Sequence, residues 1–176
     1  MEGEGEGLRY RGAGAKDVDE IYALEAASYP EDEAATRGGI EKRIREAGRF
    51  FVLAETTGTS VGGKGGDLAG FVNGTLTTST ELTHETMSNH EPEGSLLCVH
   101  SVVVAPALRR KGVALAMLRE YVQSLRRDGE NGVKEVRLIC KEGLKGLYLK
   151  AGFDLVGPSP VVHGKDPWFE MKLGLH

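Results

Sequence analysis

The chain alternates short apolar runs with segments in which apolar residues recur at helical spacing. A short run begins at Leu8, and longer runs of strand length lie at 50–56, 67–77, 96–105, 135–141, 153–162 and 168–175. Helical spacing occurs at 16–29, 32–48, 109–127 and 143–152. The order of these elements predicts a mixed α/β sheet covered by helices.

The elements differ in how strongly their residues specify them. Segment 109–127 has one apolar helix face, made of Ala114, Met117, Leu118, Tyr121, Val122 and Leu125. Gly38 and Gly39 each lower the helix propensity of 32–48 by about 1 kcal/mol, so we expect a loosely held segment there. The glycine-rich segment 57–66 has the composition of a hairpin loop, and the polar segment 78–95 predicts an exposed loop.

Composition then narrows the classes of function. The 22 Lys and Arg residues against 26 Asp and Glu residues give a net charge of −4, which argues against a general nucleic-acid binder. No apolar stretch approaches the roughly 20 residues of a membrane span. The acidic, glycine-rich start differs from a targeting signal. We therefore expect a disordered tail at 1–7, one domain over 8–176 and a cytoplasmic protein.

Neither the cysteines nor the histidines indicate a metal or redox site. Cys98 and Cys140 lie inside apolar runs and lack the spacing of a metal or redox motif, so we expect reduced thiols and no disulfide. His84 and His90 lie in the polar segment without clear ligand partners. We expect no bound metal.

The strongest chemical signal is the turn between the strand at 96–105 and the helix that follows it. A strand that enters a helix through a glycine turn directs several unpaired N–H groups, and the positive end of the helix dipole, at one point. Gly112 allows close approach to the backbone, while Arg109, Arg110 and Lys111 raise the local potential. These features predict a phosphate site. The alternative is an ordinary solvated, basic helix start.

The order of residues in "RRKGVA" favours the first interpretation, because it resembles the acetyl-CoA motif of the GCN5-related N-acetyltransferase (GNAT) superfamily. The resemblance implies a single-domain GNAT fold with seven mostly antiparallel strands and about four helices. It also implies that the acetyl-CoA pyrophosphate lies against the motif that opens at Arg109, on the amides of Arg110, Gly112, Val113, Ala114 and Leu115. The amides near Val102 and Val104 would lie beside the pantetheine arm.

Further segments resemble the arylalkylamine (serotonin) N-acetyltransferase branch of this superfamily, and in particular its non-vertebrate members. The similar segments are "LEAASYPEDEA", "CVHSVVV", "LYLKAGF" and "GPSPVVHGKDPWFEM". Together they extend the resemblance over roughly residues 8–175, with the segments 56–67 and 78–95 unmatched. The resemblance implies acetylation of an arylalkylamine such as serotonin, tryptamine or phenylethylamine, by direct attack in a ternary complex.

His100 is the candidate general base. An imidazole, with an ordinary pKa of about 6.5, suits removal of a proton from an alkylammonium, and the period of two predicts that His100 shares a strand face with Val102 and Val104. The alternative is a core histidine bonded to a backbone carbonyl. Vertebrate members of the branch usually have a His-x-His pair, but this chain has Cys98 at the first position. A buried thiol is a poor base, so we interpret Cys98 as a packing residue.

The other candidate residues come from the resemblance. Tyr148 matches the tyrosine that protonates the departing thiolate, although it could instead pack on the sheet as a helix-face aromatic. The acceptor pocket would be formed by Tyr29 and Pro30 together with His163 and Trp168 of the last strands. Trp168 would supply an aromatic wall, or it could be plain core.

Two other functions stay open. Polyamines or protein amino groups could be the acceptors, and a polyamine would suit acidic walls from Glu31, Asp32 and Glu33. The chain could also be a non-catalytic acyl-CoA-binding module. In each case we expect a monomer whose partners are small molecules, with neither nucleic acid nor a membrane.

Overall fold

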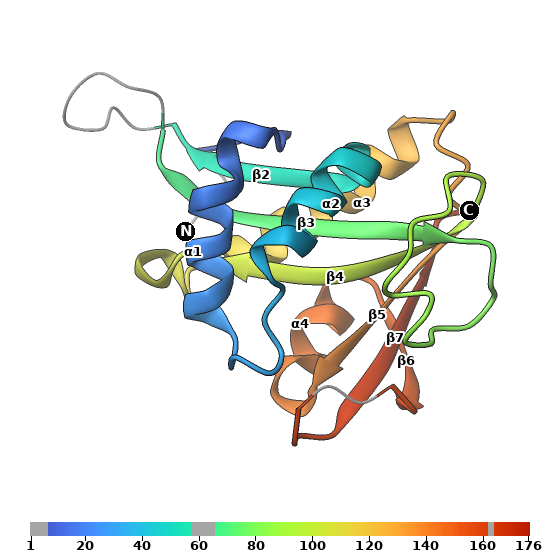
Figure 1. Cartoon of the computed structure of the whole chain (residues 1–176). Coiled ribbons are helices and arrows are strands. Elements are labelled where there is room, and N and C mark those ends of the chain that lie inside the picture. The colour runs from blue at the N-terminus through green and yellow to red at the C-terminus, as the bar shows by residue number, and fades with distance from the viewer. Residues whose placement is uncertain (1–6, 58–65, 162–163) are drawn as a thin grey trace.

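The computed structural model describes residues 7–57, 66–161 and 164–176. In these residues the chain forms one seven-stranded sheet with helices on both faces (Figure 1). The strands are β1 (Leu8–Gly12), β2 (Phe51–Thr56), β3 (Leu68–Thr77), β4 (Leu96–Val104), β5 (Glu135–Lys141), β6 (Asp154–Pro158) and β7 (Trp168–Gly174). The α-helices are α1 (Val18–Ser28), α2 (Arg37–Ala47), α3 (Val113–Arg127) and α4 (Lys145–Lys150). Short 3-10 turns cover Ala15–Asp17, Gly48–Phe50, Pro106–Leu108 and Glu142–Leu144.

The strand order is β1-β2-β3-β4-β5-β7-β6, and every neighbouring pair is antiparallel except β4 and β5. This arrangement confirms the predicted fold class. The parallel pair is short, because only Leu96–Cys98 pair with Glu135–Arg137. Beyond these residues the two strands diverge, as Figure 1 shows, and the sheet opens in its middle.

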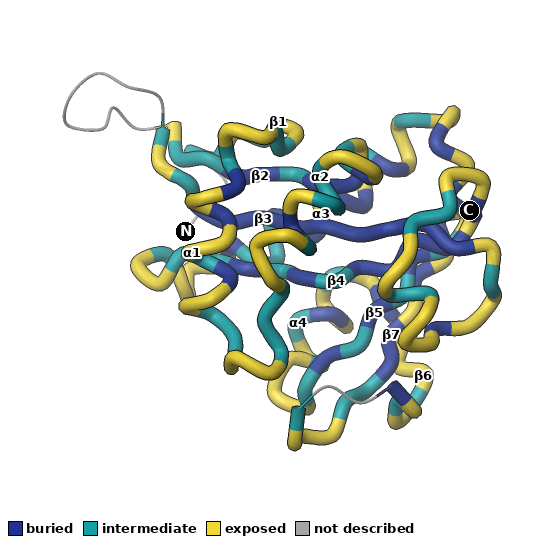
Figure 2. Tube along the Cα trace, viewed as in Figure 1, coloured by how far each residue is buried: buried dark blue, intermediate teal, exposed yellow. Residues whose placement is uncertain are grey.

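Helices cover the two faces of the sheet over separate apolar clusters, and the buried residues follow the central strands (Figure 2). On one face, Ile21 of α1 and Ile40 of α2 pack with Phe71 of β3. On the other face, the apolar stripe of α3 packs on the sheet, and Met117 and Leu118 are almost fully buried. Each such side chain contributes about 1.5–3 kcal/mol through removal of its surface from water.

The four α-helices all begin later than the sequence pattern predicts, and the difference is largest for α2 and α3. Helix α2 starts at Arg37 instead of residue 32, because the Thr36 hydroxyl accepts the Gly39 N–H at 3.0 Å and caps the helix. Helix α3 starts at Val113 instead of residue 109, because Gly112 before it has a left-handed backbone with φ of 78°.

The segment 78–95 contains neither helix nor strand and most of its residues are exposed, as the sequence predicts, but three of its side chains contact the sheet. Leu82 is buried against Leu96 of β4, and Met87 packs beside it. The backbone N–H of Leu76 donates to Nδ1 of His90 at 3.0 Å. Several polar residues are exposed, but these contacts fix the segment to the sheet, which its polar composition did not indicate.

Some predictions fall on residues outside the described part of the chain. They are the tail at 1–7 apart from Gly7, the centre of the loop at 58–65, and His163. Among the described helices, none has the length and apolar character needed to cross a membrane.

Candidate active site

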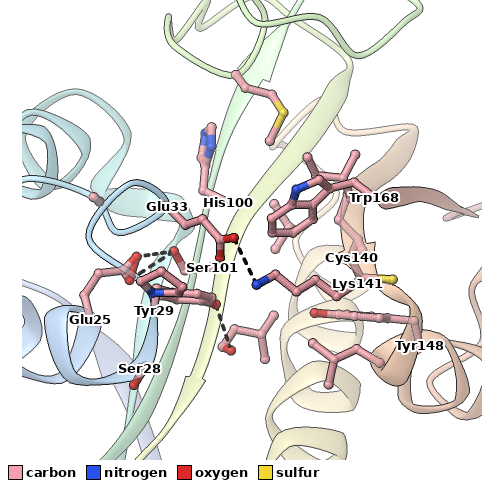
Figure 3. A pocket seen from close by; sticks show the side chains of 18 of the residues that line it. Glu25, Ser28, Tyr29, Glu33, His100, Ser101, Cys140, Lys141, Tyr148 and Trp168 are labelled. Carbon is pink, nitrogen blue, oxygen red and sulfur yellow. Dashed lines mark hydrogen bonds and ion pairs between the residues drawn. The ribbon is translucent and has the colours of Figure 1, made fainter. Parts of the chain in front are cut away.

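The opening between β4 and β5 holds a cavity of about 360 Å³, which lies within the size range of small-molecule sites. Four consecutive residues of each strand line it, Val99–Val102 of β4 and Leu138–Lys141 of β5. Tyr29, Pro30, Tyr148 and Trp168 line the same cavity. Figure 3 shows the labelled side chains of Tyr29, Tyr148 and Trp168 around it with His100. The structure therefore brings six of the predicted site residues together, since Val102 also lines the cavity.

His100 lies at a bulge in β4. Ser101 is opposite Asn73 and Val99 is opposite Gly74, so His100 is the extra residue without a counterpart in β3. Nε2 of His100 lies 2.7 Å from the Thr75 hydroxyl.

The bulge also decides which face of the sheet His100 occupies. Thr75, its partner, lines a second cavity together with α2 residues, whereas Val102 and Val104 pack against the cluster that contains α3. The prediction that His100 shares a face with Val102 and Val104 is therefore wrong. That prediction assumed that side chains alternate strictly between the two faces of the strand, and the extra residue at the bulge interrupts this alternation.

The backbone of β4 beyond the bulge directs polar groups toward the cavity side. The carbonyl of Val102 accepts from the Tyr29 hydroxyl at 3.4 Å, and that of Val104 accepts from Nε of Arg109 at 3.0 Å. In an antiparallel strand the N–H and C=O of one residue point to the same side. The amides of Val102 and Val104 therefore lie on the edge that faces away from β3.

The turn before α3 presents unpaired backbone donors. Arg110 has a φ of 62° and Gly112 a φ of 78°, and no backbone hydrogen bond among the described residues uses the N–H of Arg110, Lys111 or Gly112. The first N–H groups of α3, from Val113 onward, have no partner within the helix. Successive donors of this kind form a concave anion site.

The side chain of Arg109 has a different position from the rest of the turn. Its guanidinium donates to the Val104 carbonyl and, at 3.1 Å, to the Ser28 hydroxyl. These bonds connect the end of β4 to the end of α1 and hold the start of the turn between β4 and α3 against both. The predicted contact of Arg109 with an anion stays a prediction.

Tyr148 comes from α4 and lies across the cavity from His100 (Figure 3). Its ring packs edge-on against Phe153, with 5.8 Å between the ring centroids and 75° between the planes. Burial raises the pKa of the Tyr148 hydroxyl well above its ordinary value. The hydroxyl therefore stays protonated and can act as a proton donor.

The two cysteines are protonated at neutral pH. Cys98 does not line the cavity but packs with Leu82 and Leu96, as predicted for a packing residue. Burial raises its pKa to about 12 and that of Cys140, which does line the cavity, to about 11. Neither thiol is available as a thiolate nucleophile.

Sequence reasoning missed most of the charged residues of the cavity. Glu25, Arg43 and Lys141 line the cavity but were not candidate site residues. Glu33 also lines it, but from the sequence it was a candidate only for polyamine binding, with Glu31 and Asp32. Those two residues are exposed and do not line the cavity. Glu25 accepts from the Ser101 hydroxyl at 2.8 Å, and burial raises the pKa of its carboxyl.

One sequence signal could have identified Glu25. It continues the buried face of α1 at the helical spacing of Val18 and Ile21, whereas Tyr22 is exposed. An acidic residue on a buried helix face indicates a polar partner. No group of three or more metal-ligating side chains occurs in the described residues.

Comparison with known proteins gives consistent similarities. The family model described as Acetyltransferase (GNAT) family matches residues 18–153. A serotonin N-acetyltransferase of Mesocricetus auratus is 30% identical over 110 residues, which are 62% of this chain and 52% of that protein. The chain thus spans about half the length of the curated relatives it matches.

Solved structures share the fold at low sequence identity. The GphF GNAT-like decarboxylase in complex with isobutyryl-CoA has a TM-score of 0.77 at 18% identity, and the match covers 96% of this chain and 100% of the decarboxylase chain. The yncA protein of Salmonella typhimurium, solved with acetyl-CoA, has a TM-score of 0.64 at 18% identity, and the match covers 96% of this chain and 94% of the yncA chain.

Proposed function

Because the chain belongs to the acetyltransferase (GNAT) family, we propose that it transfers the acetyl group of acetyl-CoA to the primary amine of an arylalkylamine, such as serotonin, tryptamine or phenylethylamine. One observation carries the proposal. A single cavity, opened by the divergence of β4 and β5, is lined by an imidazole, a buried phenol and an indole.

The turn before α3 fits the diphosphate of acetyl-CoA. The N–H groups of Arg110, Gly112, Val113, Ala114 and Leu115 would bind it, and the cationic side chains of the turn would offset its charge. The backbone of Val102 and Val104 faces away from β3, so it would bond the pantetheine arm along the strand edge.

His100 and Tyr148, on opposite walls of the cavity, would each carry out one of the two proton transfers that the reaction needs. An alkylamine is mostly protonated at neutral pH, so His100 would accept a proton from it, directly or through water. Tyr148 would donate its proton to the departing thiolate. The position of Tyr148 on the cavity wall supports this role, because a phenol is protonated at neutral pH and therefore carries a proton to donate.

The lining of the cavity favours an aryl acceptor over a polyamine. Two carboxylates, Glu25 and Glu33, are balanced by two cations, Arg43 and Lys141, so the walls are not strongly acidic. Most of the remaining wall is apolar or aromatic, including Trp168. Such a wall suits an acceptor with one ammonium group and an apolar body.

The proposal is tested by release of the CoA thiol in the presence of arylalkylamines, polyamines and peptide amines. We expect turnover with tryptamine and phenylethylamine, and slower turnover with spermine. Initial-rate plots for a ternary complex intersect, so parallel lines would contradict direct transfer. Binding of acetyl-CoA without thiol release on any amine would instead indicate a non-catalytic acyl-CoA-binding protein.

The raised thiol pKa values predict that cysteine chemistry plays no part in transfer. Replacing Cys98 or Cys140 by alanine is expected to leave kcat within about twofold, because neither thiol ionises near neutral pH. Alkylation of the native protein should be slow at neutral pH and should accelerate as the pH approaches about 11, the pKa of Cys140. An acetylated cysteine in a protein quenched during turnover would contradict this prediction.

Replacing Gly112 by alanine is expected to weaken acetyl-CoA binding about tenfold. The left-handed backbone at φ of 78° costs about 1–2 kcal/mol for a residue with a Cβ, so the turn would lose the alignment of its amides. Gly132→Ala is the matched control, since Gly132 is exposed, has a φ of 74° and lies outside the turn before α3. Calorimetry should show that both variants lose thermal stability but that only G112A loses affinity, and equal affinities would count against the assignment.

A further inference from the structure

A compact charge cluster crosses the cavity from the end of β5 to the segment after α1. The Lys141 ammonium, at the end of β5, is 2.9 Å from Oε1 of Glu33 and 3.1 Å from Oδ2 of Asp166. It also lies 5.5 Å from the centroid of the Trp168 ring. One ammonium therefore connects the segment after α1, the strand β5 and the segment before β7, and Figure 3 shows its ion pair with Glu33 across the cavity.

The two carboxylates that hold Lys141 have very different surroundings. The side chain of Glu33 is 4% exposed, whereas that of Asp166 is 63% exposed. Oε2 of Glu33 is buried and has no hydrogen-bond partner among the described residues. A buried carboxylate oxygen without a donor is costly, so this atom would readily accept another N–H group.

A primary ammonium ion is the donor that this environment suits. It presents three N–H groups and a positive charge, which match a buried carboxylate beside the face of an indole. The Lys141 ammonium is itself such an ion, so the chain's own side chain lies where the ammonium of an acceptor would bind.

We propose that Lys141 occupies the ammonium subsite of the free protein and that the acceptor amine binds to Glu33 by exchange, with Lys141 moving onto Asp166. This inference rests on the proposed function, because it concerns the acceptor of that reaction. The exchange leaves every charge paired. The incoming ammonium takes both oxygens of Glu33, and Lys141 keeps the exposed carboxylate that already contacts it.

The exchange makes Lys141 a specificity-determining residue. An acceptor must bind Glu33 more favourably than the tethered lysine does, and only one ammonium is needed to replace it. The apolar part of the acceptor, packed on Trp168, supplies the difference. Removal of the Lys141 charge should therefore tighten the binding of any primary amine.

The chain contains a single tryptophan, so the fluorescence of Trp168 reports on this subsite without turnover. Phenylethylamine is titrated in the absence of acetyl-CoA. Lys141→Gln is expected to lower the Kd for phenylethylamine about tenfold, because the Lys141 ammonium then no longer competes for the carboxylate of Glu33 through a charge-assisted hydrogen bond. Lys141→Arg keeps the competing charge and should retain the wild-type Kd. Lys145→Gln is the matched control, because Lys145 lies over Phe169 and outside the cavity.

A double-mutant cycle with Asp166 separates exchange from a structural role. Asp166→Asn removes the carboxylate that receives Lys141 and should raise the Kd several-fold, and this effect should vanish when Lys141 is already glutamine. The proposal is overturned if K141Q weakens or does not change amine binding, if D166N acts equally in both backgrounds, or if no variant responds to the amine.

The same experiments distinguish failure of this inference from failure of the proposed function. Thiol release by the wild-type protein with phenylethylamine tests the reaction, and the ratio of Kd values tests the exchange. Turnover with an unchanged Kd in K141Q would remove the inference and leave the function. Tighter amine binding in K141Q, without thiol release on any amine, would contradict the proposed function and would leave the exchange of Lys141 for an amine supported.

Discussion

Replacing Tyr148 by phenylalanine is expected to lower kcat about a hundredfold, with a much smaller change in the KM for acetyl-CoA. Proton donation by a positioned side chain is worth at least this factor in rate. The hydroxyl is the only group removed, and the ring would keep its edge-on packing against Phe153. The loss would thus reflect the missing proton donor.

Steady-state kinetics over a range of acetyl-CoA concentrations would measure the effect of Tyr148→Phe. Tyr22→Phe is the matched control, since Tyr22 is 39% exposed on α1 and should keep wild-type rates. An unchanged kcat in Y148F would exclude the hydroxyl as the acid. A fall in thermal stability that accounts for the lost rate would show instead that the residue acts through packing.

Replacing His100 by glutamine is expected to lower kcat/KM for the amine about a hundredfold at neutral pH. Glutamine keeps a hydrogen-bonding group toward Thr75 but cannot accept a proton as a base. The defect should shrink as the pH rises, because a growing share of the amine is then already neutral.

The pH profile of kcat/KM is the measurement that identifies the role of His100. The wild-type protein should lose rate on the acidic side as an imidazole base becomes protonated, and H100Q should have lost this limb. The exposed His176 provides a control through His176→Gln. A defect of constant size at every pH would indicate that His100 only supports the bulge.

Much of the fold could be predicted from the pattern of apolar residues. Three elements face a packed layer: the apolar stripe of α3, the continuous apolar run of β4 and the apolar residues of β5. The spacing of their apolar residues therefore matches the faces that are buried, and it can be recognised in the sequence. The start of α2 could not be read in the same way, because one threonine hydroxyl at Thr36 decided where the helix begins.

The candidate site was less accessible to sequence reasoning. Tyr148 and Trp168 belong to segments that resemble known ones, and both line the cavity. The bulge at His100 could not be predicted, since a period of two assumes an unbroken strand. Lys141 and Glu33 lie far apart in the chain, and their ion pair depends on packing that no local pattern records.

Because β4 and β5 pair over so few residues, the cavity between them is lined from two separate parts of the chain. The part before α3 contributes His100 and Glu33, and the part after α3 contributes Tyr148, Trp168 and Lys141. A chimaera that takes the part after α3 from a relative is therefore expected to change which acceptors are used, while it retains His100 and the turn before α3.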